Sequence, residues 1–385
     1  MRGAVCLLLI TAALCADDLD EFDLIEFPQV DRTREVNDAF SLSGSVSLRA
    51  AYQFEKTSVR DRIRELQARG GIESRFAPLE NGFFKLSAEG VLEGAKEAAA
   101  KNRIELSEAF FQARIGAGDI KIGRQIAVWG KSDMIRVTDA LNPLDMQEPA
   151  MSDVSNLRLG VTMAKVDFYA GDWDLQAIAI PEIRFGKLPN APSEFAQIEI
   201  EDDRKPKGTQ GAIAAIGAFE GWDLSLYAAS LYLDKPLYHE RANMIGAAIA
   251  LAVGDFVFKG EAAFWDEPDG DYEKRDFLLG AEYYGFSDAT ITVEAANSRE
   301  DRADAQTYAA RIEREFFNAR LKLSALSTVN YQDGKNGGFA RVQGAYELSD
   351  DYAFTIGAVC YFGSLPPYGA FDRNDRLFLR LNASF

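Results

Sequence analysis

Charged residues of both signs gather between Trp129 and Asn156, the longest stretch of the chain without regular alternation of apolar and polar residues. The same stretch holds large apolar side chains, among them Met134, Ile135 and Leu141. A loop wholly in water would not need so many apolar groups, so we expect it to pack against the rest of the protein. Fixed charges in such a confined space act on a solute more strongly than in bulk water. The candidates for lining a narrow point are Trp129, Lys131, Asp133, Arg136, Asp139 and Asp145.

Two further features bear on this narrow point. Asp133, Arg136 and Asp139 are spaced so that all three would share one face of a helical turn. A second long loop, from Glu182 to Lys207, adds Arg184 as a candidate for the same constriction.

Residues suited to catalysis or metal binding are scarce. The only histidine, His239, falls in a predicted loop, and no cysteine and histidine cluster has metal-site spacing. The loop aspartates Asp301, Asp304 and Asp333 do not match the spacing of a calcium loop. We therefore predict no catalytic residue, no metal, no cofactor and no enzymatic activity.

The last ten residues show what kind of element must position the loops. Leu377, Leu379 and Leu381 share one face of a predicted strand, while Arg376 and Arg380 share the other. A strand that is apolar on one side and charged on the other suits a wall with lipid outside and water inside. The strand ends on Phe385, and this pattern resembles the closing strand of a bacterial outer-membrane barrel, whose terminal aromatic residue serves as the insertion signal.

Strands of this kind recur from residue 40 to the C-terminus. Leu48 is followed by Arg49, and Phe258 by Lys259, at alternating positions of two-faced strands. We predict an all-β fold, a transmembrane antiparallel up-and-down β-barrel of about 18 strands, over residues 40–385. The alternative is a soluble β-sandwich whose core would hold the aromatic rings.

Tight turns alternate with longer polar loops along the chain, which predicts short turns on the periplasmic side. Aromatic residues crowd these turns and are expected to form a girdle at the lipid interface. The turns fall at residues 80–82, 116–119, 170–172, 220–221, 254–255, 286–288, 317–319 and 349–350. The girdle candidates are Tyr169, Trp173, Phe219, Trp222, Phe256, Tyr283, Phe286, Phe316, Phe317, Tyr352 and Phe385.

The N-terminus carries an export signature. Residues 1–16 combine a basic start with a short apolar run and small residues, which predicts a cleaved signal peptide. Cys15 also invites a lipoprotein reading, but Leu14 is poorly suited to precede a lipid-acceptor cysteine. If cleavage removes Cys6 and Cys15, only Cys360 remains and no internal disulfide can form.

Residues 17–39 form an acidic leader, interpreted as a flexible periplasmic segment, a docking site for a periplasmic partner or a plug. No later stretch approaches the ~20 apolar residues of a membrane helix. The formal net charge of −18 argues against nucleic acid as a partner. The expected partners are outer-membrane lipid, the barrel-insertion machinery and an unidentified transported solute.

A sequence motif between Gly123 and Asp145 points to a particular protein family. It comprises Gly123-Arg124-Gln125, then Trp129-Gly130, and finally Asn142-Pro143-Leu144-Asp145. The motif resembles that of the proteobacterial outer-membrane barrel family of domain of unknown function 1302, and its first part is similar to alginate-export-type barrels. The resemblance implies an outer-membrane transport role, with some relatives suspected of moving hydrophobic compounds alongside inner-membrane permeases. It names no catalytic residue.

Arg124 breaks the pattern of its strand and is a further constriction candidate. It shares parity with Ile122 and Ile126, so an uninterrupted strand would direct it at lipid. A bulge near Gly123 would rotate the guanidinium inward, whereas a position near the rim would let it extend to water.

Two readings of function follow. In the first, residues 129–156 fold into the lumen of a channel or transporter, narrowing it for small or hydrophobic solutes. In the second, the barrel is a structural or assembly scaffold, or part of an envelope export system with an inner-membrane permease. For the loop itself, the alternative is an outward lid packed on its own apolar residues. We expect the Gram-negative outer membrane as the location in both readings of function.

Overall fold

The computed structural model describes residues 40–54, 63–79, 81–94, 102–189, 195, 206–235, 239–268, 270–301, 303–371 and 373–385. The expected signal peptide (1–16) and acidic leader (17–39) lie outside these residues. No helix among the described residues has the length and apolar character needed to cross a membrane.

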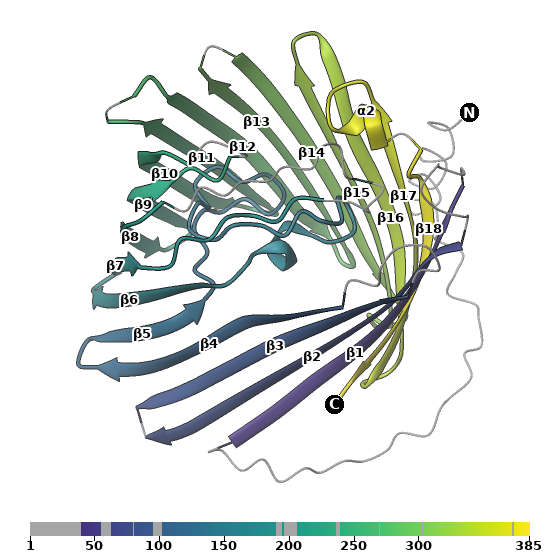
Figure 1. The fold of residues 1–385 in the computed structure, drawn as a ribbon, viewed down its shortest axis with the longest axis horizontal. Helices are drawn as coiled ribbons and strands as arrows, with labels where there is room; N and C mark the ends of the chain where they lie inside the picture. The colour runs from purple at the N-terminus through teal and green to yellow at the C-terminus, as the bar shows by residue number, and fades with distance from the viewer. Residues whose placement is uncertain are drawn as a thin grey trace.

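Eighteen antiparallel strands form one closed sheet, because each strand pairs with its neighbour in sequence and β18 pairs back onto β1 (Figure 1). The prediction of an 18-stranded up-and-down barrel is confirmed. The strands are β1 (Phe40–Gln53), β2 (Ile63–Leu79), β3 (Gly82–Gly94), β4 (Arg103–Ile115), β5 (Gly118–Gln125), β6 (Val161–Ala170), β7 (Trp173–Ile180), β8 (Gln210–Phe219), β9 (Trp222–Tyr232), β10 (Arg241–Val253), β11 (Phe256–Asp266), β12 (Glu273–Phe286), β13 (Ala289–Glu300), β14 (Ala303–Phe316), β15 (Leu321–Gln332), β16 (Lys335–Ser349), β17 (Tyr352–Gly363) and β18 (Arg376–Ser384).

The two faces of the wall follow the alternation in the sequence. Leu48 and Phe258 are 53% and 45% exposed on the outer face, whereas Arg49 is 4% exposed and lies inside. Because side chains alternate across a strand, one consistent register places an apolar outer surface around the barrel and charged groups in the lumen.

The short connections fall where the turn residues predict them and join β2 to β3, β4 to β5 and so on to β16 and β17. Aromatic rings meet beside them: Phe219 stacks on Trp222 at 4.4 Å between ring centroids, and Phe256 lies 4.7 Å from Tyr283. The girdle candidate Phe316 is buried, and the Arg314 guanidinium lies 4.8 Å from its ring centroid. Phe316 ends β14 beside the turn and has the outward parity of Tyr308, which is exposed on the same strand.

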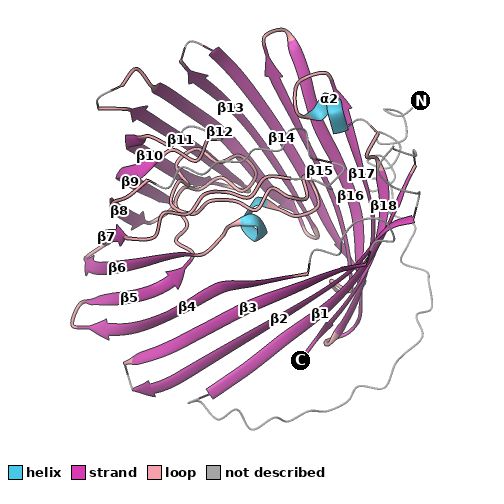
Figure 2. Cartoon of the chain, viewed as in Figure 1, coloured by secondary structure: helices cyan, strands magenta, loops and turns pink. Residues whose placement is uncertain are grey.

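The wall is lower on one side. β5 and β7 have 8 residues each and β6 and β8 have 10, whereas β2 has 17 and β4 has 13. The chain that leaves β5 crosses the interior of the ring of strands before it enters β6, and its path includes the short 3-10 helix Val154–Leu157 (Figure 2). A second short helix, α2 (Tyr368–Phe371), lies between β17 and β18.

Candidate functional site

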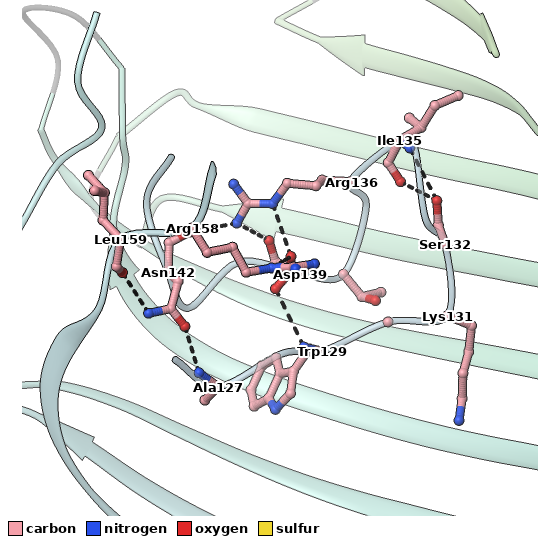
Figure 3. A network of polar contacts seen from close by, with 12 residues as sticks. Ala127, Trp129, Lys131, Ser132, Ile135, Arg136, Asp139, Asn142, Arg158 and Leu159 are labelled. Atoms are coloured by element: carbon pink, nitrogen blue, oxygen red, sulfur yellow. Dashed lines mark hydrogen bonds and ion pairs between the residues drawn. The ribbon is translucent and has the colours of Figure 1, made fainter. Parts of the chain in front are cut away.

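The loop from residue 126 to 160, called here the lumen loop, is fastened at its base by Asn142. The side-chain oxygen of Asn142 accepts a hydrogen bond from the Ala127 backbone N–H at 2.8 Å, and its amide nitrogen donates to the carbonyls of Gln125 and Leu159 (Figure 3). Gln125 in turn donates to the Met163 carbonyl at 3.1 Å. Asn142 is 1% exposed, so these bonds replace water for backbone groups where the chain leaves the wall.

A second polar centre lies on Asp139. Its carboxylate accepts hydrogen bonds from Arg158 Nε at 2.8 Å and from the Trp129 backbone N–H at 3.4 Å (Figure 3). Arg136 Nε lies 3.2 Å from the same carboxylate, and the Arg136 guanidinium also donates to the Asn142 carbonyl at 2.8 Å. The two arginines therefore hold the turn of the lumen loop together.

The expectation of a helical turn through Asp133, Arg136 and Asp139 is wrong, because the segment has no helix. Arg136 and Asp139 face each other, while the Asp133 carboxylate lies 2.7 Å from Lys259 Nζ on β11. In this short segment, hydrogen bonds from the backbone N–H groups of residues 133–135 to Glu294 of the wall take the place of helical hydrogen bonds.

Apolar residues of the lumen loop pack on one sector of the inner wall. The Trp129 ring stacks on Tyr227 at 4.7 Å between centroids, and the Tyr227 hydroxyl accepts the Gly130 N–H at 3.0 Å. Trp129, Val137 and Leu141 are buried in a cluster with inward-facing apolar residues of β6 to β12. This apolar inner sector explains why the loop carries so many large apolar side chains.

Two carboxylates of the wall anchor the tip of the loop. Glu261 on β11 accepts the backbone N–H groups of Lys131, Ser132 and Thr138 at 2.6, 2.7 and 3.0 Å. Glu294 on β13 accepts the backbone N–H groups of Asp133, Met134 and Ile135 at 2.9, 3.2 and 2.9 Å. Both glutamates are at most 5% exposed. Each supplies a concentrated acceptor for amides that form no regular secondary structure.

The later part of the loop contacts the opposite wall. Glu148 accepts hydrogen bonds from Arg49 of β1 at 2.7 Å and from Gln67 of β2 at 2.8 Å. Burial favours the neutral acid, but the attraction of Arg49 and these hydrogen bonds outweigh it and lower the pKa of Glu148 to about 2. Arg341 of β16 donates to the Ala150 carbonyl at 3.1 Å and also pairs with Asp153.

The second loop joins the first through its backbone. The Met146 N–H donates to the Lys187 carbonyl at 2.8 Å, and the Lys187 N–H donates to the Leu144 carbonyl at 2.9 Å. Asp145, a constriction candidate, lies beside this junction with its carboxylate 3.8 Å from Lys187 Nζ. Arg184, the other candidate of this loop, donates to the Gly160 carbonyl at 2.6 Å.

Arg124 follows neither expected route in full. The pairing of β5 with β4 and β6 runs through Gly123 without a shift in register, so β5 has no bulge there, although Gly123 has a φ of 127°. The guanidinium instead reaches past the end of β5 to Glu182, 2.7 Å away.

Two cavities flank the lumen loop. One of about 240 Å³ lies between the loop and the β2 to β4 wall, where Arg69, Arg103 and Glu148 line it. The other, of about 330 Å³, lies between the loop and the β8 to β12 wall, beside Arg136 and Asp276. Charged side chains contribute to the lining of both, as expected of solute-accessible space rather than a dry core. Among the described residues, no group of three or more His, Cys, Asp and Glu side chains is arranged to hold a metal ion.

The family model described as "Protein of unknown function (DUF1302)" matches residues 37–385. The chain belongs to this family. The predicted resemblance is therefore confirmed. None of the curated proteins matches the sequence.

Solved structures with the same fold are outer-membrane channels. Pseudomonas aeruginosa OccK1 (OpdK) aligns with a TM-score of 0.60 at 12% identity, over 90% of this chain and 99% of that one. Acinetobacter baumannii OccAB2 gives 0.59 at 10% identity, with 90% and 98% covered. Salmonella typhi OmpF, solved with daunomycin, gives 0.52 at 11% identity, with 91% and 99% covered. At these identities the likeness shows the fold alone, a porin-like barrel.

The sequence-predicted candidates end in three groups. Arg136 and Asp139 hold the loop's own structure. Trp129, Lys131 and Asp133 contact the wall, through Tyr227, Asp223 and Lys259 respectively. Arg124, Asp145 and Arg184 gather near the end of β5 and the second loop. Sequence reasoning missed the wall partners Glu261, Glu294, Arg49 and Arg341. The inward parity of those charges was the available signal.

Proposed function

We propose that the protein is a channel of the Gram-negative outer membrane that passes small solutes along the barrel axis through a constriction formed by the lumen loop. The porin-like fold and the apolar outer surface support the location.

The observation that carries the proposal is how the loop is held. Glu261 and Glu294 fasten its tip to β11 and β13, and Arg49 and Arg341 bind its later part from β1 and β16. The loop therefore bridges two sides of the lumen. A barrel of this size is wider than side chains alone can fill, so a fixed crossing loop sets what space is left.

The charge along the remaining space supports polar solutes. Arg380 of β18 is the cross-strand partner of Arg49. Arg49 pairs with Glu148, whereas Arg380 makes no ion pair among the described residues. Like charges directly opposite each other are unfavourable unless an anion lies between them. Glu148 supplies one such anion, and a passing anion would supply another. The basic sector thus favours small anions, and Pseudomonas aeruginosa OpdK, a protein of the same fold, was solved with vanillate.

A scaffold barrel is the alternative, and conductance separates the two. Purified protein in planar bilayers should carry a steady current with a reversal potential that favours anions, and replacement of residues 131–137 by two glycines should raise the conductance. A correctly folded, heat-modifiable barrel that carries no current would support the scaffold. Membrane fractionation of the expressed full chain tests the location.

A periplasmic or inner-membrane transport partner is part of the same proposal. The acidic leader, 17–39, where such a partner would dock, lies outside the described residues. Loss of co-purification with envelope proteins on deleting 17–39 would test it.

A further inference from the structure

The wall of the barrel is interrupted beside the end of β5. The pairing of β4 with β5 starts at Ala109 and Arg124, and within the described part of the chain no strand pairs with residues 103–108 on that edge. β6 starts against the same place, since a Cβ on Gly160 would lie 1.9 Å from the Ser107 carbonyl oxygen. Beyond this point the edge of β4 has no backbone partner among the described residues.

The interruption falls at membrane depth. The 8 residues of β5, at about 3.3 Å per residue and a tilt of about 40°, cover roughly 20 Å of height, less than the ~25 Å apolar band of such barrels. Outward-facing apolar residues continue above that level, with Leu106, Ile104 and Leu92 exposed. Open backbone edges are not tolerated against lipid, so something other than a strand must cover this one.

Charged side chains cover it, and we call this group the seam: Glu105, Arg124, Glu182, Arg184 and Lys187. Lys187 Nζ lies 2.7 Å from Glu105, and Arg184 pairs with the same carboxylate. Arg124 lies 2.7 Å from Glu182, which accepts the Thr162 N–H at 2.7 Å. Ionisable groups at this depth are expensive, and their presence there by default indicates function.

The inner side of the seam opens on a cavity. The cavity of about 240 Å³ is lined by Glu105, Ser107, Gly160 and Lys187 and also by Ile126 and Leu159. A molecule in it has polar groups on one side and apolar groups on the other, and the apolar outer face of β3 and β4 lies just beyond the seam. Ion pairs between side chains can part and re-form without loss of backbone pairing, unlike a strand ladder.

We propose that the seam is a lateral outlet, through which an amphipathic molecule with an apolar body and one hydrogen-bonding end group passes from the lumen into the bilayer. The end group exchanges partners with the seam charges while the body moves toward Leu106 and Ile104. The outlet rests on the proposed outer-membrane location but is separate from ion passage along the axis.

The test joins the two sides of the seam covalently. In a Cys360→Ser background, Glu105→Cys and Arg184→Cys are linked with a short bis-maleimide in Gram-negative cells, whose lipopolysaccharide leaflet slows apolar probes. Uptake of N-phenyl-1-naphthylamine, an apolar fluorophore with one N–H, should rise in the unlinked variant, which lacks the ion pair. After linking, uptake should fall to the level of cells without the protein.

The matched control links Thr307→Cys to Asn330→Cys. These side chains are 2.8 Å apart on β14 and β15, which are paired along their length, so linking them should not change uptake. Uptake that persists after the seam is linked would overturn the outlet. As a second measurement, bimane on Ser107→Cys should be quenched by brominated lipids, and absence of quenching counts against the proposal. Conductance of the linked protein should persist; if no variant conducts, the axial channel fails while the uptake comparison still decides the outlet.

Discussion

At the residue scale, Asn142 shows how the family motif works in this chain. Its amide joins the start of the lumen loop, at Ala127, to its end, at Leu159. Replacing Asn142 with Ala leaves buried backbone groups without partners, at a cost of about 1–3 kcal/mol each. We expect Asn142→Ala to fold but to show larger current fluctuations and faster proteolysis within the loop. Asn297→Ala, at an exposed position on β13, is the control, and equal behaviour of both variants would contradict this role.

Glu148 provides a prediction on pH. Its pKa is lowered from 4.5 to about 2, so its attraction to Arg49 is fully present above pH 4.5 and is lost as the pH falls toward 2. We expect steady conductance between pH 7 and 4.5, and increasing fluctuations of the loop below that range. Glu148→Gln should fluctuate at pH 7 already and change little on acidification. Parallel pH profiles for the two proteins would show that this ion pair does not hold the loop.

At the element scale, the lumen loop depends on carboxylates far away in sequence. Glu261 and Glu294 each accept hydrogen bonds from backbone N–H groups of the tip. Glutamine at either position would replace one accepting oxygen with an NH2 group, which cannot accept a hydrogen bond from a backbone N–H. We expect Glu261→Gln and Glu294→Gln each to raise conductance, and the double variant to approach the protein shortened over residues 131–137. Glu313→Gln, on β14, is the control. If the double variant conducts like the parent, these anchors do not set the constriction.

The strands could be predicted from the sequence and the path of the loop only in part. A period of two and local turn residues fix the strands, because each pairs with its neighbour along the chain. The apolar content of 129–156 indicated burial correctly. The wall residues that anchor the lumen loop could not be found in the same way. Lys131 and Glu261 are 130 positions apart, and the sequence around an inward-facing charge does not identify the residue that it binds. Hydrogen bonds to the wall also replaced the predicted helical turn at Asp133.

At the scale of the whole molecule, a barrel is closed by its least local pairing, β18 with β1. Phe385 completes it, because its N–H donates to the Gly44 carbonyl at 3.0 Å and its carbonyl accepts the Gly44 N–H at 2.9 Å. The ring lies over Gly44, where an added Cβ would come within 2.4 Å of it. The residue that the sequence indicated as an insertion signal therefore also fastens the last strand to the first.

Deletion of Phe385 should lower the amount of heat-modifiable barrel in the outer membrane while export across the inner membrane continues. The loss of two hydrogen bonds, about 0.5–1.5 kcal/mol each, and of the ring that covers the junction weakens closure at the step where β18 must find β1. Gly44→Leu should have the same effect by displacing the ring with the C-terminus intact. Phe286→Ala removes an exposed ring beside another short turn, so it tests whether any girdle aromatic has this effect. Normal barrel levels in both the deletion and Gly44→Leu would show that closure does not depend on this contact.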